Sequence, residues 1–425
     1  MEFSLPKKII AIISKLNDSG YSAHLVGGCV RDMLMGLEPK DWDITTNALP
    51  QEVKGVFHQT YDTGLRHGTL TVCYEGLMAE ITTWRKDSHY SDHRRPDHIL
   101  FSQALTEDLM RRDFTMNAIA YHPQQGLTDP FNGISDIKEK LIRCVGNPMQ
   151  RFSEDALRML RAVRFSAQLD FVIDAGTLEA IKKLSGDLRY VSRERVSAEI
   201  NKILVSHHPE RLSLLWDVGL GQEIFPGITA MPPRFTEASL ALMAPGEPEL
   251  DRKPPKDRRK VLFLSLLFFL AFGEYAPQHA VKLLKGLKYD NATLNGAKRL
   301  LMALMELRTP SLRNVRRVLG VYGREAAEDA LRIMGVLNPA IAPSMKGFAR
   351  LDSPVPALTG ADLSKTGSFV GPDIGNTLEL LNFCLWERTD INDVQTLMLL
   401  ARYLQKLKLG EAHPFRHEPG STPIQ

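Results

Sequence analysis

The amino-acid sequence predicts an α+β fold in which a small mixed sheet with helices is followed by an all-helical remainder. Up to about residue 140, short β-prone runs alternate with helical stretches, as in a small mixed domain. After that point, apolar residues recur at three- and four-residue spacing between short polar connectors, as on amphipathic helices. The chain has 425 residues, which is enough for roughly two to four domains.

The expected elements follow in chain order. Residues 9–16 have a helical pattern, and the β-prone runs are residues 25–26, 44–45, 69–73 and 99–101. The later helices are residues 177–184, 197–204, 209–218 and 280–287, with linkers at residues 232–233 and 245–260. The apolar run at residues 261–272 is shorter than the roughly 20 residues that cross a bilayer, so we expect a buried helix there.

Composition and cysteine usage narrow the class of protein. The formal net charge is only +3, so any nucleic-acid binding must come from local basic patches. The cysteines lack a Cys-x-x-Cys spacing, which argues against a zinc site or a disulfide framework and favours a reducing compartment. The start of the chain lacks the layout of a signal peptide, so we expect a cytoplasmic protein with no membrane association. The four cysteines are Cys29, Cys73, Cys144 and Cys384.

Two aspartates, Asp41 and Asp43, flank Trp42 about ten residues after the run 27–32, which begins with a pair of glycines. In a strand, alternate side chains share a face, so both carboxylates would point to one place while the indole turns toward the core. Paired carboxylates suit Mg²⁺, which completes its shell with waters and substrate phosphates. An Asp-x-Asp pair is also common in solvated turns, but here it follows an apolar strand, the glycines and an amphipathic stretch in that order.

The glycines and a third acid extend this interpretation. Gly27 and Gly28 let backbone amides approach an anion closely, and Arg31 can pair with phosphate oxygens in a forked geometry. These residues and a metal would together hold a nucleotide triphosphate. Glu80 heads a β-prone run, and three carboxylates from neighbouring strands could hold two metals for an in-line displacement at phosphorus.

Arg111 and Arg112 precede Asp113 and the apolar run 114–120, which we interpret as a helix. An arginine beside a helix N-terminus is well placed to hold phosphate. The alternative is a surface ion pair between either arginine and Glu107, Asp108 or Asp113.

A second charged pattern lies at Asp155, Arg158, Arg161 and Arg164, which share one face of a helix if the helix runs through all four. Apolar residues occupy the opposite face, so one face packs and the other is free to bind. The alternative is a solvated helix in which Asp155 and Arg158 form an ordinary i,i+3 ion pair. Three arginines with little compensating acid nearby favour the binding interpretation.

Five motifs, in order, resemble those of the class II CCA-adding enzymes (tRNA nucleotidyltransferases) and the related bacterial poly(A) polymerases. Beyond residue 201 only length and helical character are similar. The motifs are residues 25–32 with Asp41 and Asp43, residues 107–120, residues 129–133 with Ile142, Arg143 and Gly146, residues 154–158, and residues 192–196 with Glu199.

The resemblance implies a role for each site residue. Asp41 and Asp43 would bind Mg²⁺, and Glu80 would help to activate the 3′-hydroxyl of tRNA. Asp155 and Arg158 would hydrogen-bond to the edge of the incoming base in place of a nucleic-acid template, since a carboxylate accepts from an exocyclic amine and a guanidinium donates to a ring nitrogen or carbonyl. The residues expected to bind the nucleotide are Gly28, Arg31, Arg112, Asp155, Arg158, Arg161 and Arg164.

The resemblance also implies a domain order. The fold would be similar to the family's seahorse-shaped arrangement of four parts, with a nucleotidyltransferase head at residues 1–136 and a neck at residues 137–205. A helical body at residues 206–307 and a tRNA-binding tail at residues 308–410 would follow. Residues 411–425 carry three prolines and little apolar content, and we expect them to be disordered.

Two features favour the addition of C, C and A to tRNA, from CTP and ATP, over poly(A) synthesis. Residues 64–72 resemble the Gly-x-x-His-Gly-Thr stretch of the CCA-adding enzymes, and the C-terminal end lacks a basic extension. The loop at residues 84–105 is intact, whereas the CC-adding enzymes look to have lost it, and we expect it to act as a mobile lever for the terminal adenosine. A poly(A) polymerase, a CC-adding or A-adding enzyme and an inactive RNA-binding protein are the alternatives. The oligomeric state is left open.

Overall fold

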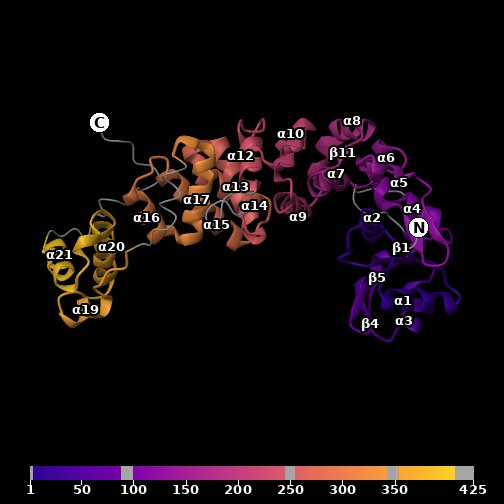
Figure 1. Ribbon diagram of the computed structural model, residues 1–425, viewed down its shortest axis with the longest axis horizontal. Helices are drawn as coiled ribbons and strands as arrows, with labels where there is room; N and C mark the ends of the chain where they lie inside the picture. Colours follow the sequence, from indigo (N-terminus) through magenta and orange to yellow (C-terminus); the bar gives the residue numbers. More distant parts are fainter. Residues whose placement is uncertain (1–2, 88–98, 245–253, 342–350, 352–353, 407–425) are drawn as a thin grey trace. The chain divides into compact units, whose positions relative to one another are not determined.

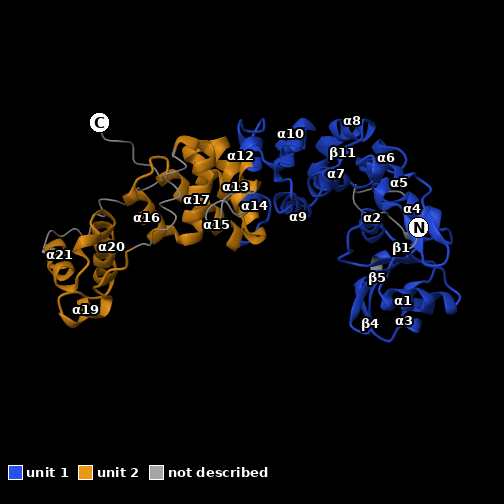
Figure 2. Cartoon of the chain, in the orientation of Figure 1, with its two compact units in different colours: residues 1–240, 282–290 blue, residues 241–281, 291–425 orange. Residues whose placement is uncertain are grey.

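The computed structural model describes residues 3–87, 99–244, 254–341, 351 and 354–406 (Figure 1). They fall into two compact units, residues 1–240 with 282–290 and residues 241–281 with 291–425 (Figure 2). The expected α+β architecture is confirmed, with the main sheet in the first unit and a helical C-terminal part. The division into head, neck, body and tail stays a prediction. Residues 88–98 of the expected lever loop and the expected disordered segment 411–425 lie outside the described residues.

A seven-stranded mixed sheet forms the centre of the N-terminal region. Its strand order is β3-β4-β5-β2-β1-β8-β9, and only β2 and β5 pair in parallel within it. The parallel pair aligns Asp43 with Glu80, the register on which the candidate site depends. The strands are β1 (Ala23–Val26), β2 (Asp43–Thr46), β3 (Thr60–Gly64), β4 (Thr69–Tyr74), β5 (Leu77–Thr83), β8 (Ala120–His122) and β9 (Gly126–Thr128).

Short helices join these strands and build the core around them. Helix α1 (Lys7–Asp18) buries Ile9, Ile12, Ile13 and Leu16, the spacing of a single apolar helix face. Both α1 and α2 contact strand β1. A separate ribbon pairs β6 (Arg85–Asp87) with β7 (Ile99–Phe101) in antiparallel fashion. The other helices here are α2 (Gly28–Leu34), α3 (Pro50–Val56), α4 (Leu105–Met110) and α5 (Gly133–Lys138).

The rest of the first unit is mainly helical. A parallel pair of two-residue strands, β10 (Leu141–Ile142) and β11 (Val172–Ile173), precedes most of these helices. The expected helix at residues 209–218 is a 3₁₀ turn, Pro209–Ser213, followed by the short α10 (Leu214–Asp217). The remaining helices are α6 (Pro148–Glu154), α7 (Leu157–Leu169), α8 (Ala175–Leu184), α9 (Arg193–Leu204) and α11 (Leu220–Ile224).

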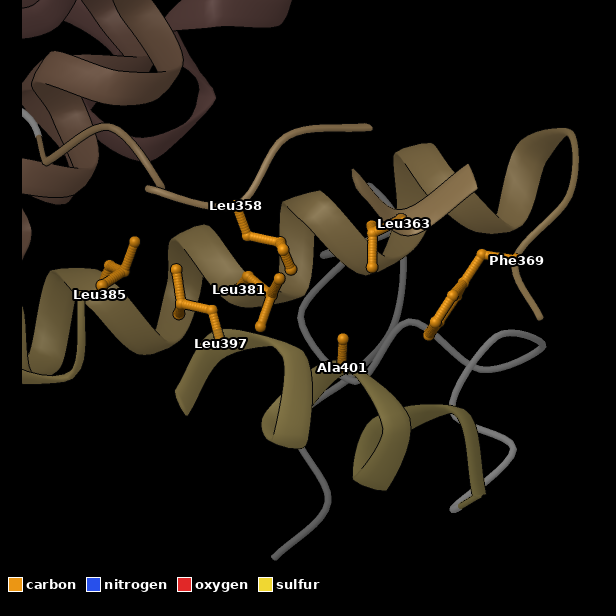
Figure 3. Packing of buried hydrophobic residues seen from close by; sticks show 7 residues of the cluster. All are labelled: Leu358, Leu363, Phe369, Leu381, Leu385, Leu397 and Ala401. Carbon is orange, nitrogen blue, oxygen red and sulfur yellow. The ribbon is translucent and has the colours of Figure 1, made fainter. Parts of the chain in front are cut away.

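Helices are the regular elements of the second unit over its described residues. The expected linker at residues 245–260 is wrong at its end, because α13 begins at Lys256. Leucines, a phenylalanine and an alanine around α19, α20 and α21 form a compact apolar cluster (Figure 3). The helices are α13 (Lys256–Phe272), α15 (Asn291–Glu306), α16 (Leu312–Tyr322), α17 (Arg324–Leu337), α19 (Gly360–Lys365), α20 (Pro372–Glu387) and α21 (Val394–Lys406), while α12 (Phe235–Met243) and α14 (Ala276–Gly286) are divided between the units.

By length and composition alone, the stretch Lys256–Gly286 could cross a membrane. It is made of two helices, α13 and α14, joined by the 3₁₀ turn Gly273–Tyr275. Half of its most apolar window is buried inside the protein. The expectation of a buried helix is confirmed for the centre of α13, where the side chains from Leu262 to Phe268 are all buried.

Candidate active site

Asp41, Asp43 and Glu80 lie near one another, where the start of strand β2 meets the middle of strand β5. The expectation that Asp41 and Asp43 share a strand is wrong, because β2 begins at Asp43 and Asp41 lies in an exposed bend before it. The pairing with β5 nevertheless reaches one residue further, since the Glu80 amide donates to the Trp42 carbonyl at 2.9 Å. Residues opposite one another in parallel strands face the same side of a sheet, so Asp43 and Glu80 point to one face.

The electrostatics of Asp43 show that these carboxylates interact. Burial raises the pKa of Asp43 to about 6, and the charges of Glu80 and Asp41 push it in the same direction, while Arg112 and Arg31 oppose them. Within the described ranges, no group of three or more His, Cys, Asp or Glu side chains is arranged to hold a metal ion. A metal bound by the aspartates would therefore need further ligands, which substrate phosphates and water supply for Mg²⁺.

The glycine turn brings backbone next to this acidic centre. Gly27 has a φ of 78°, a conformation that favours glycine, and Gly28 begins helix α2. A Cβ atom on Gly27 would lie 3.2 Å from Arg112 Nη1 and 3.6 Å from Asp43 Oδ2. The positive φ and the tight approach to Arg112 both favour glycine here, so the chain can approach a bound anion closely.

Arg112 reaches the site by a different route from the one expected. The predicted helix over residues 114–120 is wrong, because those residues form a 3₁₀ turn, Thr115–Asn117, and then enter strand β8. Arg112 instead follows helix α4, and its Nη2 donates to Asp108 Oδ2 at 3.1 Å. Arg111 pairs with the same buried carboxylate at 2.7 Å.

Arg111 and Arg112 therefore form ion pairs with Asp108, which is buried and not on the surface as the alternative interpretation expected. These pairs leave one N–H group of Arg112 over. Arg112 Nε is buried and has no hydrogen-bond partner among the residues that the structure describes. A buried N–H group without a partner is costly, and an anionic ligand would satisfy it. Arg112 Nη1 lies against Gly27, so the unsatisfied donor belongs to a guanidinium beside the glycine turn.

Asp155 does not lie on the helix that carries the three arginines. Helix α6 ends at Glu154 and α7 begins at Leu157, while Asp155 between them is extended with a φ of −145°. Its carboxylate accepts a hydrogen bond from the Leu157 amide at 3.1 Å, a local bond that competes with continuous helix. The shared helical face predicted for Asp155 is wrong for this reason.

The i,i+3 ion pair that the sequence offered as an alternative is replaced by other partners. Asp155 pairs with Arg195 of helix α9 at 2.8 Å. Arg158 pairs with Glu154 at 2.7 Å and donates to the Arg111 carbonyl at 2.8 Å. Asp155 and Arg158 are thus held from two sides by residues of α6, α9 and the segment after α4, which fixes their positions beside the start of α7.

Arg161 and Arg164 point into charged partners rather than open space. Arg161 pairs with Asp113 at 2.6 Å and Arg164 with Glu199 at 3.2 Å. Burial, with the nearby charge of Arg161, lowers the pKa of Arg164 to about 10. The expectation of little compensating acid is wrong, because each arginine of α7 has a carboxylate that comes from another part of the chain or the preceding helix.

The sequence interpretation did not include several residues that organise this site. Arg31, for example, donates to Asn117 at 2.8 Å as well as to its neighbour Asp32. Most of these residues fall inside the motifs, but nothing in the sequence says which charges pair. They are Asn117, Glu154 and Arg195.

Paired acids on a mixed sheet, a glycine turn and a buried arginine with an unsatisfied donor define the head of a nucleotidyltransferase. Residues 23–143 match the family described as "Poly A polymerase head domain", and residues 170–231 match "Probable RNA and SrmB- binding site of polymerase A". The CCA-adding enzyme of Pediococcus pentosaceus is 35% identical over 402 residues, which cover 93% of this chain and 97% of that protein. The chain belongs to the CCA-adding enzyme family.

Solved structures agree with this assignment. The Bacillus stearothermophilus CCA-adding enzyme in complex with CTP is 29% identical, with a TM-score of 0.76 over 95% of this chain and 98% of that chain. The Thermotoga maritima CCA-adding enzyme complexed with tRNA has a TM-score of 0.65 at 21% identity, over 94% of this chain and 96% of that chain. This second likeness supports the fold.

Proposed function

We propose that this chain adds C, C and A to the 3′ end of tRNA, using CTP and ATP without a nucleic-acid template. The observation that carries the proposal is the alignment of Asp43 with Glu80 beside Gly27 and Arg112. The choice of tRNA, CTP and ATP as substrates is supported by similarity to a CCA-adding enzyme over 93% of this chain. In each step the tRNA 3′-oxygen forms a bond to the α-phosphorus of the nucleotide, the bond to diphosphate breaks, and the hydroxyl proton leaves.

We propose Mg²⁺ as the metal, bound by Asp41 and Asp43. The fit rests on the chemistry of the donors, since carboxylate oxygens suit Mg²⁺ and a cation would offset the burial and the neighbouring acidic charges that keep the pKa of Asp43 high. When bound, Mg²⁺ supplies charge stabilisation on the triphosphate. Glu80 is exposed on the same face, where it can orient the tRNA hydroxyl and accept its proton.

The protein groups for the nucleotide divide into two sets. Gly28 and the guanidinium groups of Arg31 and Arg112 are proposed to hold the triphosphate. Asp155 and Arg158 are proposed to read the base edge, with Arg195 holding the aspartate in place. Both sets lie in the first unit, which also contains the RNA-binding match at residues 170–231.

The proposed function is tested by incubating the protein and Mg²⁺ with tRNA that lacks its 3′ end. We expect two cytidines with CTP alone, a complete CCA end with CTP and ATP, and no extension with UTP or GTP. Product length on a sequencing gel is the measurement. A long adenosine tract would identify a poly(A) polymerase, and tRNA binding without extension would identify an inactive RNA-binding protein.

Removing Arg158 is expected to change nucleotide choice. In Arg158→Ala the guanidinium that donates to the base is lost, and we expect the preference for CTP over UTP to fall about tenfold or more, the scale of one good base contact. Arg195→Ala should do the same, because it frees Asp155. Competition between labelled CTP and UTP measures the preference.

Arg193→Ala is the matched control for these two variants. Arg193 lies on the same helix as Arg195, but its guanidinium donates to the Glu223 carbonyl at 2.9 Å, away from Asp155. An unchanged CTP preference in both Arg158→Ala and Arg195→Ala, with turnover reduced equally for every nucleotide, would contradict base reading.

A further inference from the structure

Four side chains form a continuous polar connection between helix α7 and helix α2. Arg161 on α7 pairs with Asp113 at 2.6 Å, and the Asn117 amide donates to the other oxygen of Asp113 at 3.2 Å. Arg31 on α2 then donates from Nη1 to the Asn117 carbonyl oxygen at 2.8 Å. We call these four residues, Arg161, Asp113, Asn117 and Arg31, the α7–α2 connection.

The connection is buried at its centre. Asp113 and Asn117 are 8% and 6% exposed, so their hydrogen bonds are shielded from solvent. Burial alone would raise the pKa of Asp113, but Arg161 and the Asn117 amide outweigh it and hold the pKa well below its usual range. Asp113 is therefore a fixed negative charge, and a low dielectric strengthens each bond in the series.

The donors of Arg31 are divided in a way that leaves one edge available. Its Nε and Nη2 both donate to Asp32 Oδ1, at 3.0 and 2.6 Å, and Nη1 donates to Asn117. A guanidinium has five N–H groups, so one remains on Nη1 and one on Nη2. A Cβ atom on Gly28 would lie 3.7 Å from Nη2, so this edge lies close to the glycine turn.

Asn117 is the only residue of the connection that both accepts and donates. Its carbonyl oxygen receives Arg31, and its amide NH₂ gives to Asp113. An aspartate at this position could receive Arg31 but would repel Asp113, and an alanine could do neither. The chemistry of an amide is therefore needed to join a carboxylate on one side to a guanidinium on the other.

We propose that Asn117 and Asp113 are positioning residues that orient the available edge of Arg31 for two hydrogen bonds to the triphosphate, with Arg161 as the anchor on α7. Arg161 then supports triphosphate binding and does not read the base. Arg158 and Arg161 are one turn apart on α7. A base that binds to Arg158 would therefore also hold Arg161, the anchor of the connection, in place. This inference rests on the proposed function.

The test is a double-mutant cycle on CTP affinity, measured by calorimetry in the absence of tRNA. Asn117→Ala is expected to weaken CTP binding about tenfold, the equivalent of one oriented hydrogen bond to a charged group. The same substitution in an Arg31→Ala background should cost little more, since the residue that Asn117 orients is gone. The CTP-over-UTP preference should stay unchanged in Asn117→Ala and in Arg161→Ala, unlike in Arg158→Ala.

Asn47→Ala is the matched control. Asn47 is another asparagine of the sheet domain, but its side-chain oxygen accepts a hydrogen bond from the Ser22 backbone amide at 2.8 Å and not from Arg31. Thermal melting of each variant checks folding, and Arg161→Lys keeps a charge beside Asp113 if the alanine variants unfold. The lysine variant should bind CTP more tightly than Asn117→Asp, which repels Asp113.

Equal losses from Asn117→Ala with and without Arg31, or a changed CTP-over-UTP preference in Asn117→Ala, would overturn the positioning role. Tighter CTP binding by Asn117→Asp than by Arg161→Lys would overturn it as well. Normal extension of tRNA by the wild-type protein alongside any of these results leaves the proposed function standing. Failure of the wild-type protein to bind CTP would instead overturn the proposed function and this inference with it.

Discussion

Asp43→Ala is expected to abolish nucleotide addition, with a loss of at least about a thousandfold in rate, because it removes both a proposed metal ligand and the acid aligned with Glu80. The loss should not come from unfolding. Burial and the neighbouring acids raise the pKa of Asp43, so its charge costs the folded protein stability when no metal is bound, and the shorter neutral side chain removes that cost. Single-turnover incorporation of labelled CTP into tRNA measures the rate.

Asp62→Ala provides the control for this variant. Asp62 is an exposed acid on strand β3 of the same sheet, where it pairs with Lys54 at 2.8 Å, and its removal should leave the rate within about twofold. Affinity for tRNA should be near that of the wild-type protein in both variants. Asp41→Ala should behave as Asp43→Ala does, and a rate near that of the wild-type protein in either aspartate variant would contradict a two-carboxylate metal site.

Asp43→Asn is expected to stabilise the metal-free protein in a pH-dependent manner. The pKa of the Asp43 carboxyl is about 6 in the folded state against an ordinary value of 3.8, so the folded protein loses this proton at higher pH than the unfolded chain does. Stability therefore falls as pH rises from about 4 to 6, and above that the full cost of the charge is present, about 3 kcal/mol. The asparagine variant avoids this cost.

Thermal melting at two pH values measures the effect. The variant should exceed the wild-type protein by about 3 kcal/mol at pH 8 but by only about 1 kcal/mol near pH 4.5. Saturating Mg²⁺ at pH 8 should stabilise the wild-type protein and leave the variant unchanged, which narrows the difference. A stability difference that did not depend on pH would mean that the Asp43 charge is already compensated in the metal-free protein.

The sequence predicted the elements whose patterns are local. Helix α1 and strands β1, β2, β4 and β7 lie where apolar periodicity and β-propensity indicate them. The strand β8 was missed because the apolar run that precedes it also fits a helix, and periodicity alone does not separate a short apolar strand from a buried helical turn. Its hydrogen bonds to β1, far away in the sequence, decide the outcome.

The acids and glycines of the site were predictable for the same reason, and the long-range partners of the α7 arginines were not. Three of the ion pairs at α7 and its start join residues far apart in sequence: Arg161 and Asp113 are 48 positions apart, Arg195 and Asp155 are 40 apart, and Arg164 and Glu199 are 35 apart. A single sequence shows only that opposite charges exist. Which of them meet depends on how α7, α9 and the segment after α4 pack.

The alignment of Asp43 with Glu80 also limits which insertions and deletions the head can tolerate. Along β5 the side chains alternate, with Ala79 and Ile81 buried and Glu80 exposed between them. The turn before β5 is only Glu75 and Gly76, both with positive φ (48° and 80°), and Tyr74 pairs with Leu77 directly across it. Loss of one residue from this turn would therefore also shift the register of β5 against β4. Loss of one residue between Leu77 and Glu80 would place the acid on the buried face and an apolar side chain next to Asp43. Loss of one residue, from this strand or from the turn before it, would thus remove activity even from molecules that still fold.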